Sequence, residues 1–593
     1  MDDCSGFLVN NAEQIYMKNL YSLIACIIIT LTLVQYRISY SDISNDKPLK
    51  VTEWDAFGYY AYLPAIFIYH DYKELKWLTA IDKKYAVTGG NGWQAEKQNN
   101  GNYVFKYLGG VAIMELPFFL IGDFIAHHTN YPPDGFSPPY QYALGFGVLV
   151  YCLLAILLLR SILLNYFKDI TVAITLILLC LASNFIQYAA IDNGQSHGYI
   201  FPLYVLIIYT TLKWHQKPRI SYSIITGYIL GLATISRPTE AIMLFIPLLW
   251  NTHTPEMAKE KWKQVKANRK HIALAICGGI LGIVPQLLYW KSATGSIIYD
   301  VGSKWEFLSP HFRVLFGWEK GWFIYTPVTI FFVLGLFFIK KFPFRKSALW
   351  FCLLNIYIII AWHDWRYGGS YSTRALVQGY PVFALPLAAI IDKILQSKWR
   401  IAFYAIGFYL TAVNMFQITQ YCATIIHYND MNRLYYTHIY LNPKPTPADI
   451  SLLDNDELIS DEGSYKQEVL LNHPNPDPIQ FTGGDNKLIV QIPLPELKLI
   501  DTQDTWLKIN CKVKAPGCLW QSYLNANIIG KDTVRKARIR LFSPISKDTA
   551  TNDYCFFMKA PELKGQNNLN LFISSPFQFN GTLYQLEITR LWK

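Results

Sequence analysis

Apolar residues in this chain are gathered into long blocks between Leu20 and Tyr421, with short polar linkers between them. A helix that spans a bilayer needs roughly 17 to 25 apolar residues. Blocks near that length lie at 20–36, 141–159, 170–190, 198–212, 272–290, 322–339, 347–362, 375–392 and 401–421. The stretch 221–250 is long enough for two short spans, broken near Arg237-Pro238. The pattern predicts a multi-pass α-helical membrane protein with about eleven transmembrane helices.

The pattern changes after about Asp449, where apolar and polar residues alternate over short runs. Such runs begin at Lys487, Trp506, Ala537, Tyr554, Leu569 and Leu583, with Gly, Pro, Asn and Asp between them. Regularly spaced short strands indicate an antiparallel β-sandwich or jelly roll. We therefore expect a membrane domain over 1–440 and a separate β domain over 449–593. The β domain could bind a glycan or acceptor, or could be a purely structural cap.

Charge gives an orientation to the predicted spans. Of the 593 residues 52% are hydrophobic and 16% charged, and the net charge is +11. Lys and Arg collect in the linkers at Arg160/Lys168, Lys213–Arg219, Lys259–Lys270, Lys340–Lys346 and Lys393–Arg400. Basic linkers lie on the cytoplasmic side of a membrane. This predicts a plasma (inner) membrane protein with a cytoplasmic N-terminus and an extracytoplasmic β domain. The positive charge forms a cytoplasmic collar and is no evidence for nucleic acid.

Two hydrophobic segments need separate interpretation. The first block, 20–36, is too long for a signal peptide and has no small-residue cleavage site after it, so we read it as an anchor. The segment 106–127 carries Lys106, Glu115, Pro117 and Asp123, so we expect an interfacial or re-entrant juxtamembrane helix there. With that assignment the basic and non-basic loops alternate, and the outer loop 37–105 precedes the helix.

The ten cysteines are scattered without the pair spacing of a metal site. Cys511 and Cys518 flank a Lys-Ala-Pro-Gly turn on the predicted outer side, where a local disulfide could form. Such a disulfide would leave Cys555 unpaired.

The first outer loop holds candidate chemistry in the run from Glu53 to Pro64. On a helix Asp55, Tyr59 and Tyr62 are four and three residues apart and share one face. A carboxylate beside tyrosines at a membrane surface suits a general base for a hydroxyl substrate. The alternative is a helix-capping aspartate and tyrosines of the interfacial aromatic belt.

Other polar residues converge on the same predicted side of the membrane. Arg237 and Glu240 lie at membrane depth, where charged groups are costly unless paired or functional. The remaining outer candidates are Asp192, Ser196, His197, Lys291, His363, Trp365, Arg366 and Arg374. Arginine offers a forked set of donors to phosphate oxygens. Each cation taken singly could instead snorkel or form a structural ion pair.

In their order along the chain, these features resemble the GT-C-fold glycosyltransferases that use polyprenyl-phosphate sugars. The nearest relatives would be the protein O-mannosyltransferases and the lipid A aminoarabinose transferases, glycosyltransferase family 39. The resemblance covers 20–421 and rests on Asp55/Tyr59, Lys106-Tyr-Leu-Gly-Gly to Pro117-Phe-Phe-Leu, Ser196-His197, Arg237-Pro238, Gly321-Trp-Phe-Ile-Tyr-Thr-Pro327 and Trp365-Arg-Tyr-Gly-Gly-Ser to Arg374. Family members often have two prolines after the juxtamembrane lysine, where this chain has Tyr107-Leu108.

The resemblance implies sugar transfer from undecaprenyl phosphate or a similar carrier to an acceptor hydroxyl at the extracytoplasmic face. Asp55 would be the base, and Glu53 could replace it or tune its acidity. Tyr59, Tyr62, His197 and Trp365 would contact substrate. The donor phosphate would be held by Lys106, Arg237 and Arg374, with Arg366, His363 and Lys291 as weaker candidates. The implied partners are the donor, a glycan, lipid or protein acceptor, and the bilayer. No cofactor is expected, although Asp55 and Asp192 could share a metal.

Two rival functions remain open from the sequence. A flippase or other transporter of lipid-linked glycans should show matching broken helices in two repeats, and only the Arg237-Pro238 break is visible. A glycan polymerase or ligase typically has a large outer loop late in the chain, whereas here it follows the first span.

Overall fold

The computed structural model describes residues 19–40, 49–89, 92, 94–473, 478–483, 487–493, 504–515, 519–529, 533–541, 551–560, 567–576 and 578–593. Contacts divide the chain into Met1–Met415 and Phe416–Lys593, and each unit is described by itself. The expected domain limits of 1–440 and 449–593 stay predictions.

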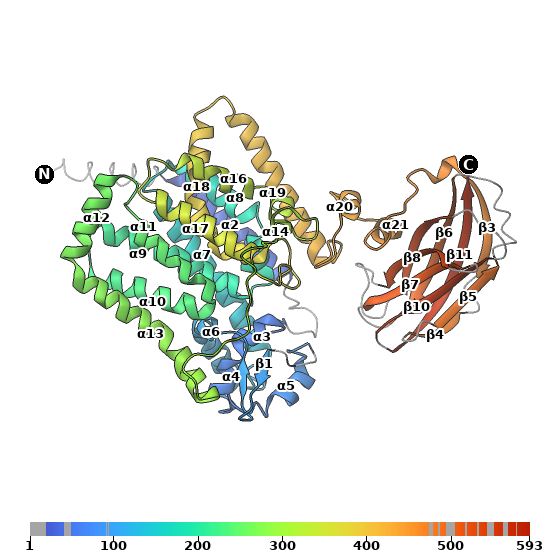
Figure 1. The fold of residues 1–593 in the computed structure, drawn as a ribbon, viewed down its shortest axis with the longest axis horizontal. Coiled ribbons are helices and arrows are strands. Elements are labelled where there is room, and N and C mark those ends of the chain that lie inside the picture. Colours follow the sequence, from blue (N-terminus) through green and yellow to red (C-terminus); the bar gives the residue numbers. More distant parts are fainter. Residues whose placement is uncertain are drawn as a thin grey trace. The chain divides into compact units, whose positions relative to one another are not determined.

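The first unit is helical (Figure 1). Its longer helices are α2 (Leu20–Ser39), α6 (Gly110–His127), α7 (Pro138–Leu163), α8 (Asp169–Leu181), α9 (Ser196–Gln216), α10 (Ile220–Ser236), α12 (Pro255–Ala267), α13 (Arg269–Thr294), α17 (Arg345–Ile360), α18 (Tyr380–Leu395) and the start of α19 (Arg400–Cys422). Its shorter helices are α11 (Phe245–Leu249), α14 (Arg313–Phe316), α15 (Trp322–Tyr325), α16 (Thr329–Leu334), η1 (Gln187–Ile191), η2 (Pro238–Leu244), η3 (Gly335–Phe338) and η4 (Arg374–Gly379).

Six helices among the described residues are long and apolar enough to cross a membrane. They are α2, α6, α7, α13, α19 and the continuous η4–α18 segment. Four shorter apolar helical segments add to them, at Asp169–Leu181, Ile220–Ser236, Pro238–Leu249 and Thr329–Phe338. The chain is therefore a multi-pass membrane protein, and the expected number of about eleven crossings stays a prediction.

Two segments differ from the sequence-based expectation. The block 322–339 was expected to be one span, but it is divided into α15, α16 and η3. Pro327 lies at the first division, where a proline cannot continue the helical hydrogen bonding. The helix α6 is one of the six with enough length and apolarity to cross, so its assignment as an interfacial helix stays a prediction.

The first outer loop folds into short elements on the membrane unit. They are α3 (Asp55–Tyr60), α4 (Tyr62–Phe67), α5 (Leu78–Tyr85), β1 (Ala95–Lys97) and β2 (Tyr103–Phe105). The strands β1 and β2 form an antiparallel hairpin. Phe105 packs on Tyr289 of α13 with 6.0 Å between ring centroids, which ties the hairpin to a membrane helix.

Helices α10 and α13 run side by side (Figure 1) and meet through glycines. A Cβ placed on Gly227 would lie 1.8 Å from the Ala275 carbonyl oxygen, and one on Gly231 would lie 2.2 Å from that of Gly279. Small residues let membrane helices approach closely enough for backbone contact. The last residue of α10 is Ser236, so this packing positions the break at Arg237.

The second unit holds α20 (Arg433–Ile439), α21 (Pro447–Ser451), η5 (Glu462–Ser464) and the β-sandwich. The strands are β3 (Lys466–His473), β4 (Ile479–Gly483), β5 (Lys487–Pro493), β6 (Thr505–Lys514), β7 (Leu519–Ile529), β8 (Thr533–Leu541), β9 (Thr551–Lys559), β10 (Asn568–Ser574) and β11 (Phe579–Trp592). All six expected strands are present, and β3, β4 and β7 are additional.

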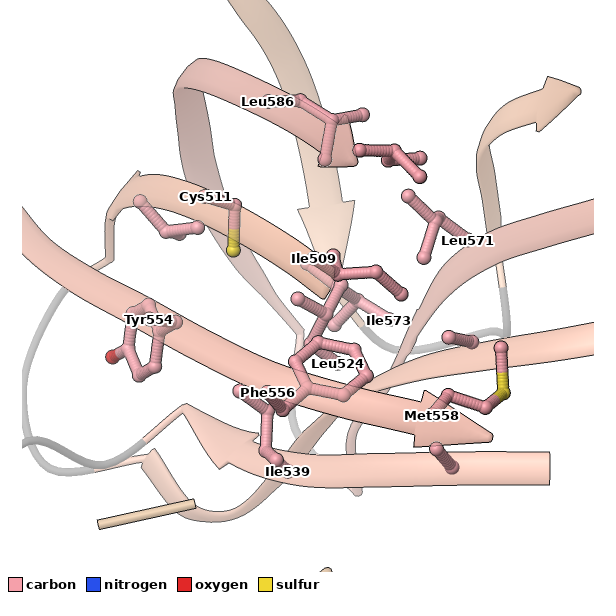
Figure 2. Packing of buried hydrophobic residues seen from close by; sticks show 14 of the residues in the cluster. Ile509, Cys511, Leu524, Ile539, Tyr554, Phe556, Met558, Leu571, Ile573 and Leu586 are labelled. Atoms are coloured by element: carbon pink, nitrogen blue, oxygen red, sulfur yellow. The ribbon is translucent and has the colours of Figure 1, made fainter. Parts of the chain in front are cut away.

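The strands form two antiparallel sheets, one in the order β5-β10-β7-β8 and the other β3-β11-β6-β9, with β4 also paired to β11. Alternate side chains from both sheets meet in one core (Figure 2). Ile509 of β6, Phe556 of β9 and Leu571 of β10 are buried there. This confirms the expected antiparallel sandwich. Cys511 is buried in this core, but Cys518 lies outside the described residues, so the disulfide is not decided.

Candidate functional site

Asp55, the predicted base, is the first residue of α3 and pairs with a residue far along the chain. The Arg374 guanidinium at the start of η4 donates to Asp55 Oδ2 at 2.5 Å, across 319 positions of sequence. The Tyr107 hydroxyl donates to Asp55 Oδ1 at 2.8 Å. The side chains of Arg374 and Asp55 are only 11% and 19% exposed. An ion pair so shielded from water is stronger than a surface pair, and both carboxylate oxygens are held in place.

The two predicted substrate tyrosines are buried around this pair. The Tyr59 ring lies 4.5 Å from the Tyr107 ring. The Tyr62 hydroxyl donates to the Tyr107 carbonyl oxygen at 2.7 Å. Burial raises the pKa of Tyr59, against the opposing effect of Arg237. The expected tyrosine face thus packs against the segment that carries Tyr107, and its contact with substrate stays a prediction.

Asp192 brings a second carboxyl group into the same electrostatic neighbourhood. Burial raises its pKa to about 6, Arg374 and Arg37 act to lower it, and Asp55 adds to the rise. Arg37 lies in the last turn of α2 and donates to Asn193 Oδ1 at 2.9 Å and to the Ile191 carbonyl at 3.1 Å. The first predicted span is therefore hydrogen-bonded to the residues on either side of Asp192.

Arg237 lies at the break between α10 and η2, as the sequence predicted. Its charge acts on Tyr59 of α3 and on Glu240, which follows in η2. The side chain is half-buried and makes no hydrogen bond or ion pair with any residue that the structure describes. A half-buried guanidinium whose donors form no hydrogen bond with described residues can accept an anionic ligand.

A polar network inside the helices fixes the residues that follow Arg237. Gln378 donates from Nε2 to Glu240 Oε1 at 2.6 Å, and the Tyr204 hydroxyl donates to the other Glu240 oxygen. His197 Nδ1 lies 2.7 Å from Gln378 Oε1, and it must be the donor because an amide oxygen can only accept. His197 is therefore engaged with Gln378, and its role in substrate binding stays a prediction.

The loop 362–374 is held by a lysine that sequence reasoning missed. Lys320 is buried, and its amino group donates to the carbonyl oxygens of Arg366 (2.8 Å) and Gly368. The Arg366 side chain is exposed and lies 5.0 Å from the Trp365 ring. His363 is exposed, and its Nδ1 lies 3.0 Å from the Lys304 carbonyl oxygen. The phosphate and substrate roles expected of these three loop residues stay predictions.

Two other predicted residues have local contacts of their own. Lys291 donates to the Gly295 carbonyl at 2.6 Å and so caps the end of its own helix, α13. Glu53 pairs with Lys50 at 2.6 Å, and burial raises its pKa although Lys50 acts to lower it. Lys106 is exposed. Of the predicted cations, Arg374 contacts Asp55 directly, and the charge of Arg237 acts on Tyr59 of the same helix.

Asp55 and Asp192 belong to no group of three metal-binding side chains in the part of the chain that the structure describes. Among the described residues no three His, Cys, Asp or Glu side chains gather in the arrangement of a metal site. The expectation that this protein needs no cofactor stays a prediction.

Four residues of the site could not be chosen from the sequence: Arg37, Tyr107, Lys320 and Gln378. Arg37 carried a weak signal, as the charge directly after the first apolar block, 20–36. Tyr107 carried another, because it replaces an expected proline beside Lys106.

One segment of the chain is similar to a known protein family. Residues 141–289 match the dolichyl-phosphate-mannose-protein mannosyltransferase family. This segment contains Asp192, His197 and Arg237, while Asp55 and Arg374 lie outside it. The match confirms the expected resemblance to glycosyltransferases over that part of the chain. No curated protein sequence matches the chain.

Solved structures that match part of this chain include ArnT from Cupriavidus metallidurans in the apo state, with 11% identity, a TM-score of 0.42 and coverage of 71% of this chain and 66% of that chain. ArnT bound to undecaprenyl phosphate has 14% identity, a TM-score of 0.42 and coverage of 71% and 68%. The Archaeoglobus fulgidus oligosaccharyltransferase in the apo form has 14% identity, a TM-score of 0.37 and coverage of 72% and 59%. The chain matches about two thirds of the length of the two ArnT chains.

Proposed function

We propose that this protein is a glycosyltransferase that moves a sugar from a polyprenyl-phosphate donor to an acceptor hydroxyl at the extracytoplasmic face of the inner membrane. The chain would have its N-terminus in the cytoplasm and its β-sandwich outside. The observation that carries the proposal is the shielded pair of Asp55 and Arg374, together with Arg237, whose charge acts on Tyr59 of the same helix as Asp55. The family match over 141–289 supports the reaction class.

Asp55 would be the general base. Each carboxylate oxygen has two acceptor sites, so the bonds from Arg374 and Tyr107 leave one site on each oxygen for an incoming hydroxyl. The acceptor hydroxyl gives its proton to Asp55 while its oxygen attacks the anomeric carbon. The bond from that carbon to the phosphate oxygen breaks, and polyprenyl phosphate leaves with the electron pair.

The leaving phosphate gains negative charge as the bond breaks, and fixed cations stabilise that charge. Arg237 is suited to this task because its side chain forms no hydrogen bond or ion pair with a described residue, although its charge also acts on the buried Glu240. Arg374 would serve mainly to orient the base. We rank Arg237 first among the phosphate ligands, ahead of the exposed Lys106.

The test is release of polyprenyl phosphate by the purified full chain in nanodiscs. The donors would be undecaprenyl phosphate carrying mannose, glucose, N-acetylglucosamine or aminoarabinose. We expect turnover of at least one donor, and a fall of roughly 10²- to 10⁴-fold in the Asp55→Asn variant. Asp300→Asn, in an exposed loop, is the matched control and should keep wild-type activity.

The two parts of the proposal fail in different ways. If the wild-type chain turns over none of the four donors, the donor class is wrong. If Asp55→Asn retains full activity on a donor that the wild type uses, the transfer reaction stands but Asp55 is not the base.

A further inference from the structure

One sheet of the sandwich carries an unusual polar row across its outer surface. Leu569, Leu571 and Ile573 of β10 are buried in the core, and Leu571 and Ile573 are visible there in Figure 2. Alternate residues of a strand point to opposite faces, so Asn570 and Phe572 lie on the outer face. The register aligns Asn570 with Gln491 of β5 and Asn527 of β7, and Asn527 with Lys536 of β8. We name these four aligned residues the amide row.

The amide row makes the sheet less stable than apolar or β-branched residues at these positions would. Asparagine is depleted in strands because it packs poorly on a pleated surface. Here β10 and β7, the two central strands, carry Asn568, Asn570, Asn525 and Asn527 at outward positions. Asn525 is explained by its bonds to the Phe572 carbonyl and to Ser574.

The other amides are not explained by internal bonding. The side chains of Asn570 and Asn527 make no hydrogen bond to any described residue, and Asn570 Oδ1 is shielded from solvent without a partner. A polar atom in that position is normally satisfied, so its lack of a partner points to a ligand.

The edge strand β8 carries four cationic side chains, and two of them form no ion pair with a described residue. In β8, Arg535 pairs with Glu457 and Arg540 with Asp454. Lys536 and Arg538 lie between these two arginines along the strand, are exposed, and have no carboxylate partner among the described residues. The Arg538 guanidinium lies 4.6 Å from the Tyr523 ring centroid, which holds it over the sheet. One end of the amide row is therefore positively charged.

We propose that the outer face of β5-β10-β7-β8 binds an acidic oligosaccharide along the amide row. Each amide offers donors and an acceptor, and each sugar hydroxyl both donates and accepts. The row spans roughly 14 Å over four strands, the reach of a short glycan. The half-buried Phe572 ring lies in the next row and gives an apolar surface for the C–H face of a sugar. Lys536 and Arg538 select a carboxylate on the glycan.

The test measures binding of hexagalacturonate and of neutral cellohexaose to the full chain in detergent by titration calorimetry. We expect hexagalacturonate to bind at least tenfold more tightly than cellohexaose. The double variant Asn527→Ala/Asn570→Ala should lose at least tenfold in affinity. Asn510→Ala is the matched control, because Asn510 is an asparagine on the other sheet, and it should bind as the wild type does.

A second variant, Lys536→Gln, tests the proposal if the double variant fails to fold. Lys536 is exposed on the edge strand, so its substitution should not disturb the core. The affinity of this variant for hexagalacturonate should fall severalfold while its affinity for cellohexaose stays unchanged. The proposal is overturned if hexagalacturonate does not bind the wild type, if the two glycans bind equally, or if binding survives in the folded variants. The outcome is independent of sugar transfer by the membrane unit.

Discussion

The carboxylate of Asp55 has a defined orientation because two donors reach it from different directions. Arg374 and Tyr107 each engage a different oxygen, at 2.5 and 2.8 Å. Removing the tyrosine hydroxyl keeps the ion pair but frees one oxygen. The Tyr107 contribution to orientation can therefore be separated from the charge of Arg374.

We expect Tyr107→Phe to lower kcat about tenfold, since a hydrogen bond to a charged group contributes about 1.5 to 3 kcal/mol and part of it orients the base. The donor KM should change little, because Tyr107 contacts Asp55. Steady-state release of polyprenyl phosphate measures both constants. Tyr103→Phe, a few residues earlier in β2, is the control and should match the wild type. Equal kcat in the two variants would show that Tyr107 does not orient the base.

Asp192 gives a pH-dependent prediction. Burial raises its pKa from 3.8 to about 6, so between these values the folded protein binds more protons than the unfolded chain. Stability should therefore fall as pH rises through this window and level off above it. We expect Asp192→Asn to remove this fall, so that at pH 7 the variant is more stable than the wild type by up to about 3 kcal/mol.

Thermal unfolding of both proteins across the pH window measures this difference. Asp300→Asn should follow the wild-type curve at every pH. Lower stability of Asp192→Asn at pH 7 would mean that the ionised carboxylate stabilises the fold through Arg374 and Arg37.

Sequence reasoning could find Asp55, Arg237 and Arg374 because each is a charge in or beside an apolar region, where a charge needs a reason. It could not find Lys320, because a buried lysine that donates to distant carbonyl oxygens looks like any loop lysine in the sequence. It also could not show that Lys291 caps its own helix, which depends on where α13 ends.

At the scale of elements, the contact between α10 and α13 sets the position of Arg237. Gly227 and Gly231 on α10 are four residues apart, as are Gly278 and Gly282 on α13. This spacing is visible in the sequence, but the partner helix is not. The break in 322–339 was not predicted, because the whole segment is apolar enough for one span. Pro327 and the division of the helix there were therefore overlooked.

We expect Gly227→Ala to destabilise the protein and to lower transfer activity at least tenfold. The added Cβ would lie 1.8 Å from the Ala275 carbonyl oxygen, so the two helices must separate and Arg237 must move. Gly279→Ala is a matched control in the same helix pair, because its Cβ would meet only ordinary contacts at 3.4 Å and beyond. Thermal unfolding and donor turnover of both variants test this. Equal behaviour would mean that the interface tolerates a wider spacing.

At the scale of the whole molecule, the switch from long apolar blocks to alternating strands predicted two kinds of structure. The sequence did not show that residues 427–457, which look like a linker, belong to the β unit. They are fastened by Arg540 of β8, which donates to both Asp454 oxygens and to Asp430, and which lies 3.1 Å from His427. Such a tie depends on partners more than 80 positions away, which no local pattern encodes.

Arg540 therefore provides a test of whether the β unit is stabilised separately from the membrane unit. Its side chain is 6% exposed, and removing it leaves the carboxylate of Asp454, itself 7% exposed, without its partner. Breaking a buried pair in this way destabilises by about 3 to 5 kcal/mol. We expect Arg540→Ala to lower the unfolding temperature of the β unit by calorimetry, while donor turnover by the membrane unit persists. Arg538→Ala, an exposed arginine on the same strand, should shift unfolding by no more than about 0.5 kcal/mol. If Arg540→Ala abolishes turnover as well, the two units fold as one, and the β-sandwich is a condition for the transfer site.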